Sequence, residues 1–448
     1  MTYHVPRADI LFVFQHLIDL PALLALPGNE EISADLLQAV LDEASRYIEQ
    51  EVAPLNRLAD TEPARLNGQT VQTTSGFKAA YSAFQQGGWQ ALQHDVQYEG
   101  QGLPKVMGAA VAESMSAACA AFALCPVLTD SVIETLILAG TPEQQELYLP
   151  SMMTGAWAGT MNLTESQAGS DLSLVQTIAR PQQDGSYRLR GEKIFISYGD
   201  HDLAENIVHL VLARTPDAPA GVQGLSLFLV PKYLAKAQGE YPQGASNDVV
   251  CASLEHKLGL HGSPTAVMRY GANEGEVGEG AIGYLVGELH QGLSYMFITM
   301  NAARYAIALQ GIGVAARALD QAEQFAAQRC QGADLEGRFA KPVSIQHHPD
   351  VERMLKTMRA LTEGTRAFAY YAAWLKDMAL KHPEAEQRLL YQCQYEFFVP
   401  IVKGFATEMV TEVASLGISK RPERLSMREI VVCLPFMRAL LLFKPMIW

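Results

Sequence analysis

One stretch divides the chain, Met161-Asn162-Leu163-Thr164-Glu165-Ser166-Gln167-Ala168-Gly169-Ser170-Asp171. Its small residues predict a turn with exposed backbone N–H groups, and Thr164 and Ser170 add hydroxyl donors. Such a loop can hold a flat heterocycle and a pyrophosphate. A plain connector rich in Ser, Gly and Asp has the same composition, so both interpretations stand on these residues alone.

The chain has a different character on the two sides of this stretch. Before it, Ala, Leu, Glu and Gln dominate and apolar residues recur at three- and four-residue steps, which indicates helices. After it, short extended runs at 207–212 and 225–230 alternate with turn residues, as in the hairpin turn at 183–186. Several strands without intervening helices predict a small antiparallel barrel or sandwich.

Helical periodicity returns after Leu293. We expect three long helices, at 296–329, 351–380 and 386–416, and their lack of heptad regularity favours a bundle. The predicted fold class is therefore α+β. Its parts are an N-terminal helical domain (1–158), a middle β domain (159–287), a C-terminal helical bundle (288–416) and an aberrant apolar tail (417–448).

Composition limits the classes of function. The 448 residues include 34 basic and 48 acidic side chains, which give a net charge of -14, and 49% are hydrophobic. The apolar content excludes wholesale disorder, and the acidic balance argues against a partner that is a nucleic acid or an anionic membrane. The length predicts about three domains.

Cysteine usage and the two apolar ends bear on location. The six cysteines form no C-x-x-C pair or disulfide framework, which favours the reducing cytoplasm. The apolar stretch 10–26 is interrupted by Gln15, His16 and Asp19, and the stretch 431–448 by Arg438 and Lys444. We therefore expect neither a signal peptide nor a membrane span.

A second stretch with chemical potential follows the loop, Gly191-Glu192-Lys193-Ile194-Phe195-Ile196-Ser197-Tyr198-Gly199. Strand alternation would place Phe195 and Ser197 on one face, where an aromatic and a hydroxyl suit contact with a ring system. An ordinary half-buried strand fits the same residues.

Two weaker patterns are interpreted as structural. Gly311-Ile312-Gly313 imitates half of a dinucleotide fingerprint but lies in a helical run with no preceding strand. The histidines at 347 and 348, and those at 256 and 261, lack the spacing of a helical metal pair.

The two stretches together resemble the acyl-CoA dehydrogenase family. The loop is similar to the family's Leu/Val-Thr-Glu-x-x-Ala-Gly-Ser-Asp signature, and residues 193–197 to its aromatic-Ile-Thr/Ser strand. The resemblance covers nearly the whole chain up to Leu416, in the same domain order. Two further segments resemble the larger bacterial branch, which includes 3-methylmercaptopropionyl-CoA dehydrogenases: Glu255-His256-Lys257-Leu258-Gly259-Leu260-His261-Gly262-Ser263-Pro264-Thr265 and His348-Pro349-Asp350-Val351.

The resemblance implies FAD as the cofactor and assigns roles to seven residues. Five would contact FAD within the chain: Leu163 and Thr164 at the flavin ring, Ser170 near the pyrophosphate, Phe195 in place of a ring-stacking tryptophan, and Ser197 in place of a threonine beside the flavin. Arg304 matches an arginine near the substrate channel. Arg329 matches an arginine that reaches FAD across the interface of a homodimer.

The resemblance also implies the reaction, dehydrogenation of an acyl-CoA thioester to the 2-enoyl-CoA. A carboxylate removes the α-proton while a hydride leaves the β-carbon for the flavin, and polarisation of the carbonyl makes the α-carbon acidic enough. The electron acceptor implied is an electron-transfer flavoprotein.

The chain departs from the family in its last part. The usual base is a Glu in a Tyr-Glu-Gly-Thr segment that follows a Gln-x-x-Gly-Gly run, but this chain has Ala414-Ser415-Leu416-Gly417 where that run is expected. An alternative position for the base, just before Arg304, holds Ala303. We therefore expect that the catalytic Glu is missing.

Codon arithmetic suggests an origin for this departure. Codons that start at the third base of those for residues 428–448 can spell Tyr-Glu-Gly-Thr, with the Glu across Met437 and Arg438. We hypothesise a frameshift near Leu416 that leaves a truncated and impaired enzyme. The alternatives are an acyl-CoA oxidase, in which O2 reoxidises the flavin, and a catalytically impaired remnant that binds FAD, acyl-CoA or a partner subunit.

Overall fold

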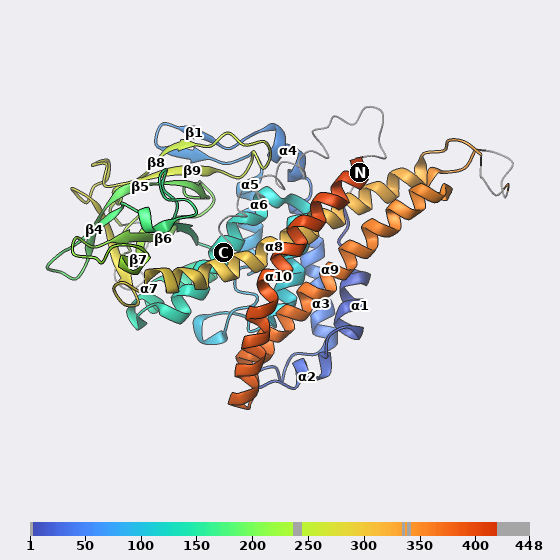
Figure 1. Cartoon of the computed structure of the whole chain (residues 1–448), viewed down its shortest axis with the longest axis horizontal. Coiled ribbons are helices and arrows are strands. Elements are labelled where there is room, and N and C mark those ends of the chain that lie inside the picture. Colours follow the sequence, from blue (N-terminus) through green and yellow to red (C-terminus); the bar gives the residue numbers. More distant parts are fainter. Residues whose placement is uncertain (1–2, 236–243, 334–336, 338–341, 419–448) are drawn as a thin grey trace.

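The computed structural model describes residues 3–235, 244–333, 337 and 342–418. It has an α+β fold in which a β-barrel lies beside a large helical body (Figure 1). Among the described residues, the first and last parts are mainly helical and the middle part forms the barrel, in the predicted order.

The first part of the chain is mainly helical. Its elements are α1 (Arg7–His16), α2 (Leu20–Leu24), α3 (Ala34–Tyr47), α4 (Leu55–Thr61), α5 (Phe77–Gln86), α6 (Lys105–Ala139) and α7 (Pro142–Met153), with a hairpin of β1 (Arg65–Asn67) and β2 (Thr70–Gln72). Local chemistry fixes several ends: the Ser33 side chain caps α3, and Thr141 with Gln144 forms a capping box at α7. The apolar stretch 10–26 forms most of α1 and all of α2 and contributes Ile10 and Leu23 to the core.

The middle part is a closed barrel. Its strands are β3 (Trp157–Asn162), β4 (Ile178–Pro181), β5 (Tyr187–Ser197), β6 (Asn206–Arg214), β7 (Leu225–Pro231), β8 (Val249–Leu254), β9 (Thr265–Tyr270) and β10 (Ala281–Val286). The sheet order is β10-β7-β6-β4-β5-β9-β8, and β10 also pairs with β5, which closes the barrel.

Not every pairing is antiparallel, which differs from the arrangement expected from the sequence. Strand β3 pairs with β6 in parallel over six residues, and β4 meets β6 in parallel at Ile178 and Arg214. The physical reason is connectivity: the long segment between β3 and β6, which includes β4 and β5, lets the chain return in the same direction.

The last part is a helical bundle of α8 (Gly292–Gln328), α9 (Pro349–Lys381) and α10 (Ala385–Ile418). The three predicted helices are confirmed to within four residues at each end. Helix α8 is about 55 Å long and runs from the barrel to the far end of the bundle (Figure 1). It therefore links the two halves of the molecule.

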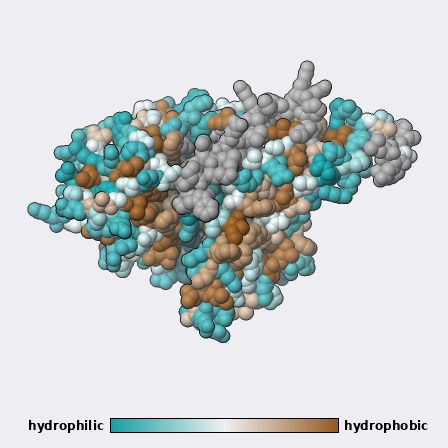
Figure 2. Space-filling view, viewed as in Figure 1, coloured by the Kyte–Doolittle hydropathy of each residue, from teal (hydrophilic) through white to brown (hydrophobic). Residues whose placement is uncertain are grey.

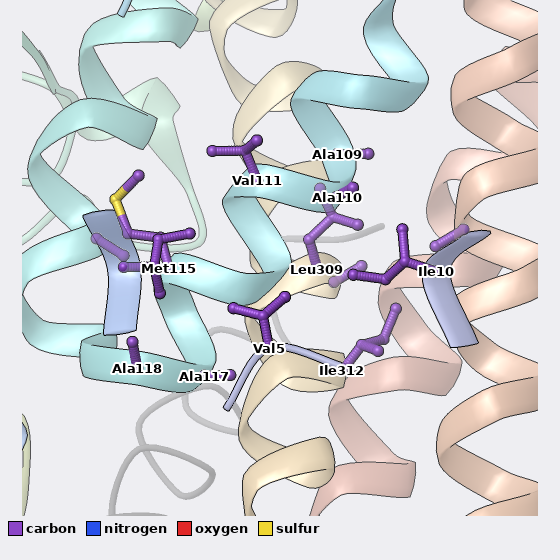
Figure 3. Packing of buried hydrophobic residues seen from close by; sticks show 14 of the residues in the cluster. Val5, Ile10, Ala109, Ala110, Val111, Met115, Ala117, Ala118, Leu309 and Ile312 are labelled. Carbon is purple, nitrogen blue, oxygen red and sulfur yellow. The ribbon is translucent and has the colours of Figure 1, made fainter. Parts of the chain in front are cut away.

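The core lies where α8 crosses α6. Figure 3 shows Ala110 of α6, Leu309 and Ile312 of α8, and Ile10 of α1 packed together. A Cβ added at Gly313 would lie 2.4 Å from the carbonyl oxygen of Glu113, so the glycine lets the two backbones approach closely. Gly313 thus serves helix packing, and the pattern lies within helix α8, as its helical context in the sequence indicated.

Two surface properties concern partners. Within the described residues, α6 is the helix long and apolar enough to cross a membrane, but 72% of its apolar window is buried in the protein. Figure 2 shows hydrophobic surface near the start of α10. The large exposed apolar side chains of this helix are Leu389, Leu390, Phe397, Ile401 and Phe405.

Candidate functional site

The loop singled out in the sequence lies along strand β5. Three hydrogen bonds join them. Lys193 Nζ donates to the Leu163 carbonyl oxygen (2.9 Å) and to Glu165 Oε1 (2.8 Å), and Ile194 N donates to the Thr164 carbonyl oxygen (2.8 Å). The structure thereby brings Leu163 and Thr164 next to the strand that carries Phe195 and Ser197.

Phe195 stands in an unusual conformation. A β-bulge between Lys193 and Ile196 interrupts the pairing of β5 with β9, and Phe195 has a φ of 60°. Lys193 is buried, and because of the bulge the next buried side chain of β5 is that of Ile196, three residues on. Phe195, between them, is 51% exposed. The simple alternation expected from the sequence therefore fails at this point, and an aromatic ring faces outward under backbone strain, a feature that clusters at functional sites.

The loop and strand β5 also carry hydroxyl groups that could meet a ligand. Within the described part of the chain, the hydroxyls of Thr164, Ser170 and Ser197 have no hydrogen-bond partner. Ser170 is exposed in the same loop, and a Cβ added at Gly169 would meet nothing within 4 Å. Open space, an exposed ring and unsatisfied hydroxyl donors fit a flat heterocycle with a phosphate-bearing tail.

A buried ion pair holds the loop. Glu165 Oε1 accepts from Lys193 Nζ (2.8 Å), and the two side chains are only 5% and 0% exposed. The same oxygen accepts from Thr177 N (3.0 Å) and Thr177 Oγ1 (2.6 Å), while Oε2 accepts from Gln176 N (2.8 Å) and Gln167 Nε2 (2.5 Å). Five donors therefore converge on one carboxylate.

The electrostatics of the pair follow from this geometry. Burial lowers the pKa of Lys193 to about 8, and the Glu165 carboxylate opposes that shift. Burial raises the pKa of Glu165, but Lys193 and the other donors outweigh it and leave the pKa below its ordinary value. Our sequence reasoning gave neither residue a role, although a lysine within a strand beside a loop glutamate is a signal for such a pair.

The two predicted arginines lie far apart along helix α8. Arg304 is half-buried in α8, where its Nη1 donates to Asn301 Oδ1 (2.7 Å) and its guanidinium lies over the Phe297 ring. Burial lowers its pKa. Arg329 is exposed at the end of α8, about 37 Å further along the helix.

The positions considered for a catalytic base carry none in the described residues. Ala303 is buried in α8. Residues 414–417 continue as helix α10, which ends at Ile418. The segment around Met437 and Arg438, where the frameshift hypothesis would place the Glu, lies outside the described residues, as does the rest of the predicted tail from 419.

The histidine pairs have structural partners. His261 Nε2 contacts the Lys257 carbonyl oxygen (2.8 Å), and its Nδ1 lies 3.0 Å from Asp60 Oδ1. His348 Nε2 contacts the Gln331 carbonyl oxygen (2.7 Å). Across the ranges that the structure describes, no three His, Cys, Asp or Glu side chains form a group that could hold a metal ion.

Comparison with known proteins identifies the class of protein. Three family models match the chain in succession: the N-terminal domain of acyl-CoA dehydrogenases at residues 35–156, the middle domain at 160–271 and the C-terminal domain at 290–419. The chain belongs to the acyl-CoA dehydrogenase family, whose enzymes are FAD-dependent oxidoreductases that act on the CH–CH group of acyl-CoA.

Individual relatives agree with this assignment. The 3-methylmercaptopropionyl-CoA dehydrogenase of Ruegeria pomeroyi is 50% identical over 418 residues, which are 93% of this chain and 69% of the relative. A Bacillus anthracis acyl-CoA dehydrogenase complexed with FAD has the same fold, with a TM-score of 0.73 at 23% identity over 94% of this chain and 65% of its own. A chain from the solved structure of an electron transferring flavoprotein of Acidaminococcus fermentans also shares the fold, with a TM-score of 0.70 at 22% identity over 92% of this chain and 98% of its own.

Proposed function

We propose that the loop 161–171 and the bulge of β5 form the FAD site of an acyl-CoA dehydrogenase. The observation that carries the proposal is the exposed, strained Phe195 beside the backbone of Leu163 and Thr164. FAD, when bound, would accept two electrons, while the residues of the chain would position the reacting groups and set their electrostatic environment.

Each residue then has a definite task. The Leu163 backbone and the Thr164 hydroxyl would contact the flavin ring, Phe195 would pack on it, and Ser197 would lie beside it. Ser170, further along the loop, would donate to the pyrophosphate. The partner-free hydroxyls in this part of the described chain support these tasks, because each can still donate a hydrogen bond.

The two arginines would act at separate places. We assign Arg304 to the acyl-CoA channel, where a guanidinium suits the anionic end of CoA. Arg329 lies too far along α8 to share that site, which supports a role toward the FAD of a second subunit in a homodimer. The exposed apolar side chains of α10 also favour self-association.

The finer substrate and partners follow the relatives. We propose an acyl-CoA substrate of the class handled by the larger bacterial branch, on the 50% identity to a 3-methylmercaptopropionyl-CoA dehydrogenase. An electron-transfer flavoprotein is the proposed acceptor, because one chain of the same fold comes from the structure of an electron transferring flavoprotein. The distribution of cysteines favours a cytoplasmic location.

Catalytic activity of this chain is a separate question from its binding of FAD. We propose that it lacks the family's usual base through a frameshift near Leu416, since neither Ala303 nor residues 414–417 supply a carboxylate. Loss of one essential member typically lowers the rate by orders of magnitude. The nucleotide sequence decides the matter: an out-of-frame reading without Tyr-Glu-Gly rules the frameshift out.

Absorption spectroscopy tests the function. We expect the purified chain to bind FAD and turn yellow, and to bleach slowly or not at all when acyl-CoA is added without oxygen. Fast bleaching would show that a base is present, and peroxide production in air would indicate an oxidase. A chain that stays colourless with added FAD would disprove the site, and Thr164→Ala should weaken binding if the site is correct.

A further inference from the structure

The Glu165–Lys193 pair has a more specific task than stabilising the barrel. We propose that it is a positioning device, which sets the distance between the Leu163–Thr164 backbone and the bulge at Phe195 and so shapes the flavin-facing edge of the site. The inference rests on the proposed FAD site.

The first argument is the number of segments that meet at Glu165. Its two oxygens accept from Gln167 in the loop, from Gln176 and Thr177 just before β4, and from Lys193 in β5. A carboxylate with both oxygens occupied cannot rotate without losing hydrogen bonds. The loop is therefore tied to two strands at a single point.

The second argument is the path from this point to the predicted flavin contacts. Lys193 Nζ also donates to the Leu163 carbonyl oxygen, and the adjacent Ile194 N donates to that of Thr164. The next residue is Phe195, at a φ of 60°. Such a conformation persists only where its surroundings impose it. Lys193, two residues away, supplies two of those constraints through its Nζ, which donates to Leu163 and to Glu165.

The third argument is energetic. Taking two charges out of water is expensive, and a buried ion pair is often replaceable by apolar residues without loss of stability. Stability alone therefore does not explain a pair at this position. A requirement for defined loop geometry does explain it, because apolar contacts do not fix an irregular backbone as directional hydrogen bonds do.

The test measures FAD affinity and flavin spectra in Glu165→Gln and Lys193→Met. Both variants keep side-chain volume and remove a charge. We expect the FAD dissociation constant to rise at least tenfold in each single variant. The double variant should bind FAD no more weakly than the single variant with the lower affinity. The flavin absorption band should shift or lose its fine structure. Glu192→Gln is the matched control, because its exposed pair with Arg269 lies one residue away on the same strand.

Three results would overturn the inference. If folded Glu165→Gln and Lys193→Met bind FAD within twofold of the parent while Thr164→Ala binds it weakly, the site is right and the positioning role is wrong. If the parent binds no FAD, the proposed function fails and this role fails with it. If the charge variants do not fold, Thr177→Val removes one donor to Glu165, and an unchanged dissociation constant and spectrum in that variant contradict the role.

Discussion

The barrel and the helical body each contain a buried ion pair, and the two pairs differ in what they join. Glu165 and Lys193 connect an irregular loop to a strand, whereas Glu113 of α6 and Arg366 of α9 connect two helices. All four side chains are at most 5% exposed. Tyr370 also donates to Glu113, at 2.8 Å.

The difference teaches where a buried charge gives order and where it only adds to stability. Around Glu113 and Arg366 the backbone is helical and its groups are paired within each helix, so the pair connects parts that already have defined shapes. Residues 163–171, which follow β3, form no such ladder among themselves beyond a bridge between Glu165 and Ala168. There the carboxylate takes the backbone N–H groups of Gln176 and Thr177 that no strand satisfies.

The largest expected effect comes from breaking the ion pair between Glu113 of α6 and Arg366 of α9. Arg366→Met leaves Glu113 buried without its cation, so we expect the free energy of unfolding to fall by about 3–5 kcal/mol, measured by urea denaturation. The FAD dissociation constant of the folded fraction should not change. Adding Glu113→Leu should recover part of the loss, because it removes the unpaired charge but leaves the Tyr370 hydroxyl without its acceptor. A loss below about 1 kcal/mol in the single variant would contradict this account.

A third buried carboxylate sharpens the comparison because backbone amides, not a cation, are its hydrogen-bond donors. Asp377 accepts from Lys105 N (2.7 Å) and Val106 N (3.1 Å) at the start of α6, and burial raises its pKa to about 6. The native state then holds the proton more tightly than the unfolded state between about pH 4 and pH 6. Its contribution to stability therefore falls as the pH rises through that window.

Asp377→Asn tests this sign. The free energy of unfolding of the parent minus that of the variant should be about 2 kcal/mol lower at pH 7 than at pH 4.5, because the ionised form is disfavoured in the native state. Urea denaturation at the two pH values measures the difference. An equal difference at both values would show that the pKa is not raised.

Two substitutions of Phe195 distinguish backbone strain at the bulge from a role in FAD binding, with a smaller expected effect. The backbone at Phe195 has a φ of 60°, a conformation that glycine adopts without strain and alanine does not. The Phe195→Gly variant should therefore be about 1 kcal/mol more stable to unfolding than the Phe195→Ala variant. Both variants should bind FAD more weakly than the parent. Thermal unfolding and FAD titration measure the two properties, and equal stability of the two variants would argue against strain.

The smallest expected effect is at the exposed pair of Glu192 and Arg269. Their side chains are 45% and 54% exposed, so solvent screens the charges. Glu192→Gln should change the free energy of unfolding by less than about 1 kcal/mol and leave the FAD dissociation constant unchanged. A larger effect on binding would show that β5 as a whole, and not the buried pair, controls the site.

Much of the fold could be predicted because local patterns encode it. Helices α8, α9 and α10 and strands β6 and β7 lie where the apolar periodicity put them. The parallel pairing of β3 with β6 could not be predicted, because it joins segments more than 40 residues apart. The outward position of Phe195 could not be predicted either, because alternation along a strand assumes regular pairing and a bulge depends on the partner strand.

The sequence by itself determined the class of this protein, the order of its parts and the stretches in which its chemistry lies. Those features depend on local composition and short motifs, which a linear chain carries in full. Only the tertiary structure decided that Glu165 and Lys193 meet and that Phe195 is exposed. Each of these depends on how distant segments pack, where burial and hydrogen-bond satisfaction across the whole molecule set the outcome.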